Sequence, residues 1–327
     1  MTGHIMNRRI RIFLTQTVAV SAVILASAAV RAAPCPEDAL GVSRTLAIGA
    51  SGGLQIGLKT YPQSLALADH EIVLTFDDGP SAFTTPKVLD ALAKECVKAT
   101  FFLVGRNAES FPELVNREVA EGHTVAHHTF SHPDVTMRGL TDSAARADIL
   151  RGFQADDKAA YGAFGNAPRV PFFRFPGFAD TPELVAWLSA QNIVVFGADL
   201  WASDWTLMTA DAERDLVLNR LDKEGHGIVL FHDTKQQTAE MLPAFLRELK
   251  QRGYKIVHLV PGTAPPPLRS APKGWTSATE KIIAEVFARM HWTVQPPKEE
   301  IPAAPAGGPS GASPQLGGQG TLPANSK

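Results

Sequence analysis

Short apolar runs alternate with amphipathic stretches through the middle of the chain. Seven runs are apolar almost throughout, as is typical of strands buried on both faces, and they cover residues 71–76, 98–104, 124–127, 170–175, 192–198, 227–231 and 255–259. Between them, apolar residues recur at helical spacing in segments 85–96, 113–121, 144–160, 182–191, 210–223 and 238–252. This alternation predicts an α/β fold with a parallel sheet. We expect a distorted (β/α) barrel of about seven strands, short of the usual eight repeats.

The first 32 residues have the layout of a secretory signal peptide. Arg8, Arg9 and Arg11 form a positive segment, an apolar run follows to about residue 30, and small residues surround a cleavage point after Ala32. The apolar run is long enough that a retained membrane anchor is the alternative. We therefore expect an exported protein, either periplasmic or secreted.

The segments on either side of the central domain differ from it in composition. Gly49, Gly52, Gly53 and Gly57 argue against a regular helix in residues 33–70, so we expect an irregular lead-in to the central domain at 71–262. Residues 263–293 form a C-terminal extension with one amphipathic segment, at 277–290, which we expect as a helix that docks on the domain. Residues 294–327 are rich in Pro, Gly and Ala, and we expect them to be disordered.

Composition narrows the class of protein. The chain has 327 residues, 45% of them hydrophobic, which suffices for one large domain with a substantial core. Its net charge is −2, with 31 basic against 33 acidic residues, so the sequence has no excess of basic residues that would indicate a nucleic-acid partner. No feature implies a protein partner, so we expect a monomer.

The chain has two cysteines, Cys35 and Cys96. In an oxidising compartment they could form one disulfide that would attach the mature N-terminus to the domain. The alternative is a pair of buried free thiols. Neither cysteine has a neighbouring Cys or His that would complete a metal-binding tetrad.

Adjacent carboxylates, Asp77 and Asp78, follow the first apolar run, and Gly79-Pro80 comes next. In a barrel the loops after the strands build the active site. The two side chains point in different directions, so one could bind a metal while the other holds a proton. A turn that simply favours Asp and Gly is the alternative.

Four of the ten histidines lie within ten residues, at His123, His127, His128 and His132. A helical turn would place His128 and His132 on one side and offer two imidazoles to one cation. An exposed polar loop or a core histidine with a satisfied hydrogen bond is the alternative, and it fits His123 and His127 better. One Asp with two His leaves coordination positions open, as in a catalytic metal site.

Three further strand ends carry polar or aromatic groups. Arg174 lies inside the fourth run and needs a carboxylate partner if it is buried, for which Asp77 is the natural candidate. The fifth run leads into two Trp and two Asp within residues 199–205, which suggests a wall that binds sugar rings; for Trp201 a core position is the alternative. The sixth run ends at His232, a candidate general acid unless it is a lone buried histidine.

Together these residues resemble the NodB-homology polysaccharide deacetylases, carbohydrate esterase family 4. The similarity spans about residues 70–260. It rests on Thr75-Phe76-Asp77-Asp78-Gly79-Pro80 for the first motif, His128-Thr129-Phe130-Ser131-His132 for the second and Leu230-Phe231-His232 for the fifth. The resemblance implies a metal-dependent hydrolase that removes N-acetyl groups from an amino-sugar polysaccharide or oligosaccharide of the peptidoglycan, chitin-oligomer or poly-N-acetylglucosamine type.

The resemblance also implies a role for each matching residue. Asp77 would be the catalytic base, positioned by Arg174, and His232 the general acid, tuned by Asp204. The metal ligands would be Asp78, His128 and His132, holding zinc, with cobalt or nickel as alternatives. The groups that contact substrate would be Gly177, Phe178, Trp205 and Leu230.

Two motifs depart from the family pattern. Gly177 follows Pro176 directly, so the N–H that stabilises the oxyanion must come from Gly177 or Phe178. Trp201 stands where the fourth motif usually has an Asp, and Asp199 lies two residues earlier. These changes bear on the substrate subsites. An O-acetyl xylan esterase, a small cyclic amide hydrolase on the same scaffold and a non-catalytic carbohydrate-binding protein stay open as alternatives.

Overall fold

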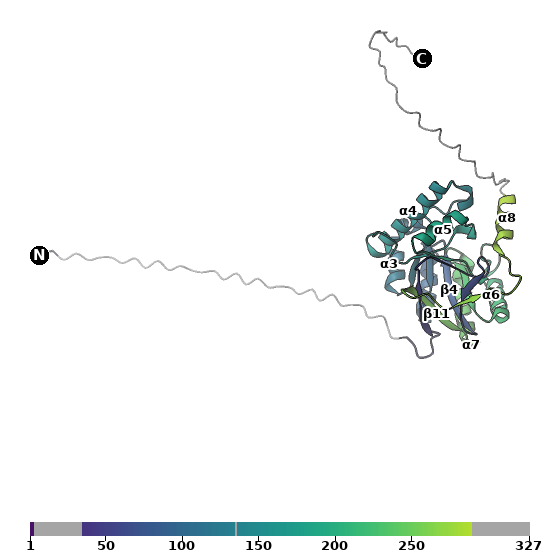
Figure 1. The fold of residues 1–327 in the computed structure, drawn as a ribbon. Helices are drawn as coiled ribbons and strands as arrows, with labels where there is room; N and C mark the ends of the chain where they lie inside the picture. Colours follow the sequence, from purple (N-terminus) through teal and green to yellow (C-terminus); the bar gives the residue numbers. More distant parts are fainter. Residues whose placement is uncertain (3–34, 135, 290–327) are drawn as a thin grey trace, which may run out of the picture.

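The computed structural model describes residues 1–2, 35–134 and 136–289 (Figure 1). The expected signal peptide or anchor, apart from its first two residues, and the expected C-terminal tail lie outside the described residues. Within the described ranges, no helix combines the length and the apolar character needed to cross a bilayer.

A ten-stranded sheet forms the centre of the domain, and all its pairings are parallel. Its main path runs β1-β11-β4-β5-β6-β7-β8-β2, and β10 pairs with both β4 and β9. The strands are β1 (Arg44–Gly49), β2 (Leu54–Ile56), β4 (Glu71–Asp77), β5 (Thr100–Leu103), β6 (Thr124–His127), β7 (Phe172–Phe173), β8 (Val194–Phe196), β9 (Leu200–Trp201), β10 (Gly227–His232) and β11 (Lys255–Gly262). All seven predicted runs form strands, and the α/β class is confirmed. Among the described residues, strand pairing does not close the barrel between β9 and β2.

Helices surround the sheet, with α3, α4 and α5 grouped on one side of it and α6 and α7 on another (Figure 1). They are α1 (Thr85–Lys94), α2 (Gly105–Ser110), α3 (Pro112–Ala120), α4 (Asp142–Tyr161), α5 (Pro182–Ala190), α6 (Ala210–Glu224), α7 (Gln236–Gln251) and α8 (Thr279–Arg289). Threonine hydroxyls cap the first turns of α4, α5 and α6, as helix starts favour. The six predicted helices of the domain are confirmed to within a few residues. The six-residue α2 was not predicted because it is too short to show a periodicity.

The alternation along β4 decides which side chains face inward. Ile72, Leu74 and Phe76 pack into the core between the sheet and the helices. Val73 belongs to a second core inside the curved sheet. Because successive strand residues face opposite sides, Asp77 shares the inner face with Val73, and Asp78 lies just beyond the strand end.

The expectation that residues 33–70 are irregular is wrong for three segments. β1 pairs in parallel with β11, β2 pairs in parallel with β8, and β3 (Gln63–Leu65) pairs antiparallel with β12 (Leu268–Ser270). The glycines argued against a helix, but they do not exclude short strands. Such strands depend on partners about 140 to 210 residues away, which a local pattern does not reveal.

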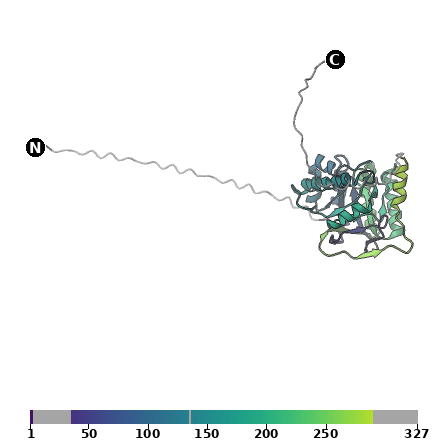
Figure 2. The same cartoon turned by 45° about the horizontal axis from the view of Figure 1, so that its top comes forward.

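The C-terminal extension packs on the domain, as predicted for its helix. Figures 1 and 2 both show α8 at the periphery against the rest of the fold. Ile283 packs on Ala179, and Arg138 bridges Glu280 at 2.7 Å and Asp180 at 3.3 Å. The strand β12 in this extension was not predicted.

Of the two alternatives for the cysteines, the structure contains the disulfide. Cys35 and Cys96 are bonded to each other, 61 residues apart in sequence. The bond attaches the start of the lead-in to the loop that follows α1.

Candidate active site

Asp78, His128 and His132 meet at the end of the inner face. Asp78 Oδ1 lies 3.5 Å from His128 Nε2 and 3.3 Å from His132 Nε2. Two ligand atoms that each lie about 2.1 Å from a tetrahedral zinc ion are separated by about 3.4 Å. Asp78 Oδ1 is buried and has no hydrogen-bond donor within the described residues. These three side chains therefore fit a divalent metal.

Both imidazoles are oriented by neighbouring groups. His128 follows β6 directly, and its Nδ1 donates to the Arg174 carbonyl at 2.7 Å, which leaves the Nε2 lone pair facing Asp78. Burial, followed by the nearby His132, lowers the pKa of His128 to about 3, which favours the neutral form that binds metals. The predicted helical turn between the two histidines is wrong. A loop with left-handed residues, Thr129 at φ 67° and His132 at φ 45°, brings them together instead.

The loop after β4 holds Asp78 in a left-handed conformation, with φ at 73°. Asn107 Nδ2 donates to the Asp78 carbonyl at 2.8 Å, so this backbone turn is anchored from α2. Burial alone would raise the pKa of the Asp78 carboxyl, but His232, His132 and His128 outweigh it and lower the pKa. Asn107 was not predicted as a site residue because α2 itself was missed.

Asp77 pairs with Arg174, as predicted. Arg174 Nη1 donates to Asp77 Oδ1 at 2.6 Å and to Thr75 Oγ1 at 2.9 Å, and Nη2 donates to the Gly197 carbonyl at 2.9 Å. The guanidinium lies 4.2 Å from the ring centre of Phe102. Both charged side chains are buried. Burial raises the pKa of Asp77 to about 6, although Arg174 opposes the shift.

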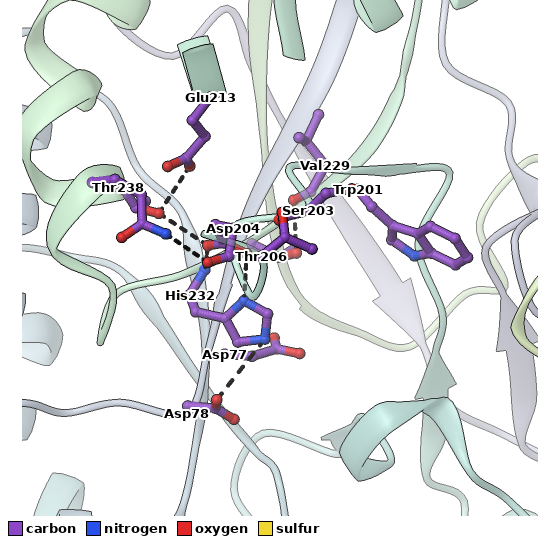
Figure 3. Close-up of polar contacts among 12 residues, drawn as sticks. Asp77, Asp78, Trp201, Ser203, Asp204, Thr206, Glu213, Val229, His232 and Thr238 are labelled. Carbon is purple, nitrogen blue, oxygen red and sulfur yellow. Dashed lines mark hydrogen bonds and ion pairs between the residues drawn. The ribbon is translucent and has the colours of Figure 1, made fainter. Parts of the chain in front are cut away.

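His232 lies at the end of β10, facing Asp77 and Asp78 on one side and Asp204 on the other (Figure 3). Its Nδ1 lies 2.8 Å from Asp204 Oδ1, and its backbone N–H donates to Asp204 Oδ2 at 2.7 Å. Nε2 lies 3.9 Å from Asp78 Oδ2. Burial alone would lower the pKa of His232, but the carboxylates of Asp204, Asp78 and Asp77 raise it to about 10.

Aromatic and aliphatic side chains line one side of this centre. The exposed Trp205 ring lies 6.0 Å from the His232 ring and 6.0 Å from Trp201, whose ring is 6.0 Å from Phe178. Leu230 is buried against Phe178. Trp201 is partly buried between Phe178 and Trp205, so it supports the wall and is more than an isolated core residue.

The altered third motif leaves one candidate for the oxyanion donor. The Phe178 N–H donates to the Phe175 carbonyl at 2.9 Å and is already used. In the part of the chain that the structure describes, the Gly177 N–H has no acceptor. Gly177 has φ at 58°, and a Cβ atom there would meet only Thr136 at 3.9 Å, so the space beside it is open.

Asp199 and two of the four clustered histidines are not part of this centre. Asp199 accepts hydrogen bonds from the Leu58 N–H and the Ile228 N–H and holds the lead-in to β10. His123 Nδ1 accepts the Ala99 N–H at 3.1 Å, and His127 Nδ1 lies 2.8 Å from the buried Asp156. Both histidines are buried core residues that form hydrogen bonds through Nδ1, while Nε2 of each has no hydrogen-bond partner among the described residues. A core position was the alternative that fitted them better.

Comparison with known proteins agrees with this geometry. The family described as polysaccharide deacetylase matches residues 66–193. A peptidoglycan-N-acetylglucosamine deacetylase of Bacillus cereus is 34% identical over 193 residues, which are 58% of this chain and 66% of that protein. The chain thus spans slightly less than two thirds of that relative.

Two other matches cover a larger share of one of the two chains compared than the Bacillus cereus match does. A chitooligosaccharide deacetylase of Sinorhizobium fredii is 34% identical over 215 residues, covering 61% of this chain and 94% of that protein. A solved peptidoglycan deacetylase of Bdellovibrio bacteriovorus superposes with a TM-score of 0.60 at 31% identity, covering 70% of this chain and 62% of that one. Given these matches and its Asp-His-His set, the chain belongs to the polysaccharide deacetylase family, whose members depend on a divalent metal.

Proposed function

We propose that this chain is a metal-dependent hydrolase that removes N-acetyl groups from an amino-sugar polysaccharide or oligosaccharide. The observation that carries the proposal is the convergence of Asp77, the Asp78-His128-His132 set and His232 at one end of the sheet. A base, a metal set and an acid lie within reach of a single amide group. The named relatives act on peptidoglycan and on chitooligosaccharides, and both polymers carry such amides.

A divalent ion held by Asp78, His128 and His132 would supply Lewis-acid polarisation of the acetamide carbonyl and a water of lowered pKa. Zinc suits this donor set best, and cobalt or nickel are alternatives. Asp77 Oδ2 lies 3.9 Å from His128 Nε2, while Asp77 Oδ1 accepts a hydrogen bond from Arg174. The free oxygen is therefore placed to accept a proton from the attacking water.

The remaining groups handle charge and the leaving nitrogen. The Gly177 N–H can donate to the oxygen of the acetamide as negative charge develops there. Asp204 occupies Nδ1 of His232, so Nε2–H is the proton that can be given to the departing amine. The C–N bond breaks, acetate forms from the acyl group and the water oxygen, and the amino sugar leaves with the His232 proton.

Release of acetate from a panel of glycans tests this function. The panel contains N-acetylglucosamine oligomers, peptidoglycan, poly-N-acetylglucosamine and acetylated xylan, each with and without a chelator. Chelator-sensitive acetate release from the N-acetylated glycans supports the proposal. Release from acetylated xylan alone would indicate an esterase. A small cyclic amide is assayed in parallel by the loss of its ring, and hydrolysis of that amide alone would indicate an amidase. Metal binding without any turnover would indicate a binding protein.

We also propose that the protein is exported through residues 1–32. The disulfide between Cys35 and Cys96 supports this, because such bonds persist in oxidising compartments. The mass of the protein recovered from the periplasm or medium tests the proposal. A mature N-terminus at Ala33 agrees with a cleaved signal, whereas a full-length chain in the membrane fraction indicates the anchor.

A further inference from the structure

Thr238 connects two carboxyl groups behind the His232 imidazole (Figure 3). It lies in the first turn of α7, and its hydroxyl oxygen is 2.9 Å from Asp204 Oδ2. The same oxygen is 2.8 Å from Oε1 of Glu213, which comes from the first turn of α6. All three side chains are buried.

Counting protons fixes the direction of these hydrogen bonds. The Thr238 hydroxyl has one proton, so it can donate to only one of the two carboxyl groups, and the other must donate to it. Asp204 already accepts two N–H groups of His232, at 2.7 and 2.8 Å, and is the acceptor expected of a carboxylate. The proton must then lie on Glu213.

The surroundings of Glu213 agree with a neutral carboxyl group. The residue is 0% exposed, and its second oxygen, Oε2, is buried with no hydrogen-bond partner in the described residues. No lysine or arginine forms an ion pair with it in those residues, so an ionised Glu213 would be a buried charge without compensation. Burial, followed by repulsion from Asp204, raises the pKa of Glu213 to about 8.

We propose that Glu213 is a positioning residue for the catalytic acid: in its protonated form it donates to Thr238, which donates to Asp204, which holds His232. The inference rests on the proposed function of His232. Glu213 touches no reacting atom. It acts by directing the only hydroxyl proton of Thr238 onto Asp204, so that both Asp204 oxygens stay fixed against His232.

Acetate-release kinetics on N-acetylglucosamine oligomers test the chain of hydrogen bonds. Glu213→Gln keeps a neutral donor and should retain kcat within about twofold of wild type. Glu213→Met and Thr238→Val each remove one link and should lower kcat about tenfold with little change in KM, the size of one hydrogen bond to a charged group. The double variant Glu213→Met/Thr238→Val should be no slower than Thr238→Val alone, because both changes break the same chain.

A matched control separates positioning from loss of packing. Val217→Ala lies one turn further along α6 and opens space in the buried core without touching the chain. It should lower stability and leave kcat unchanged. The proposal is overturned if Glu213→Gln is as slow as Glu213→Met, if the double variant multiplies the single losses, or if Val217→Ala loses as much kcat as Glu213→Met.

Unfolding by urea as a function of pH tests the protonation of Glu213 without any turnover. A carboxyl whose pKa is raised by folding adds stability below the pKa of the unfolded chain and loses it as pH rises through the folded value. The wild-type midpoint should therefore fall relative to Glu213→Gln between about pH 4.5 and pH 8. A parallel pH dependence of the two proteins would contradict a protonated Glu213. A wild-type protein that releases no acetate would refute the proposed function instead, and the unfolding comparison would still decide this point.

Discussion

The Arg174 guanidinium lies 2.6 Å from the Asp77 carboxylate, and both side chains are buried. Removing one member of such a pair leaves an uncompensated charge, which typically costs about 3–5 kcal/mol. Arg174→Met should therefore lower the free energy of unfolding by about that amount. The double variant Arg174→Met/Asp77→Asn should recover part of it, as measured by urea unfolding. Equal stability of the single and double variants would contradict the pairing.

The metal content of the purified protein should depend on the three predicted ligands, and not on how many histidines the segment 123–132 contains. His132→Ala removes a ligand and should leave the purified protein with less than one tenth of the wild-type metal, as measured by elemental analysis. His123→Ala is the matched control, because His123 belongs to the same ten-residue segment but packs against Phe101 in the core. It should lose stability and keep its metal. Full metal binding by His132→Ala would exclude the assigned site.

The site could be predicted from the sequence because its residues lie at the carboxyl ends of predicted parallel strands, and these ends meet at one edge of the sheet. Asp77, Arg174 and His232 were predicted for that reason. Glu213 and Thr238 were missed because each is one polar residue in the first turn of a helix, where polar residues are common for capping alone. Their importance depends on how α6 and α7 approach each other, which no local pattern encodes.

The fold shows the same limit. The seven buried strands were visible as apolar runs because both of their faces are covered. β1, β2 and β3 were missed since they are partly exposed and paired with strands far along the chain. The left-handed residues Thr129 and His132 likewise gave no local signal, and the turn between the histidines was predicted as helical.

The ion pair between Arg44, in β1, and Glu71 should make the stability of the protein sensitive to acid. Two hydrogen bonds of 2.7 Å join the guanidinium to the carboxylate, and those from Arg44 are the main cause that lowers the pKa of Glu71 to about 2. A depressed carboxyl pKa adds stability above the unfolded value of 4.5 and loses it as pH falls toward 2. The free energy of unfolding of the wild type, measured in urea, should therefore exceed that of Glu71→Gln above pH 4.5, and the difference should disappear as pH falls from 4.5 to 2. A constant difference across that interval would argue against this ion pair.

Loss of the disulfide should affect stability more than activity. Its cysteines are 61 residues apart, and closing a loop of that length in the unfolded chain is worth about 4 kcal/mol. The double variant Cys35→Ser/Cys96→Ser should unfold at a lower temperature in calorimetry, with kcat unchanged because neither residue is near the metal ligands. A large loss of kcat at a temperature where the variant remains folded would contradict this separation.

The most direct test of the proposed chemistry is acetate release by Asp77→Asn. Asp77 is not one of the three predicted metal ligands, so the variant should retain its metal. Its loss leaves the buried Arg174 without a carboxylate partner and lowers stability, so kcat is measured at a temperature at which unfolding curves show the variant to be folded. We expect kcat on N-acetylglucosamine oligomers to fall at least about a thousandfold, as for loss of a general base, with metal content equal to wild type. Turnover within tenfold of wild type would contradict the assignment of Asp77 as the base and, with it, the proposed mechanism.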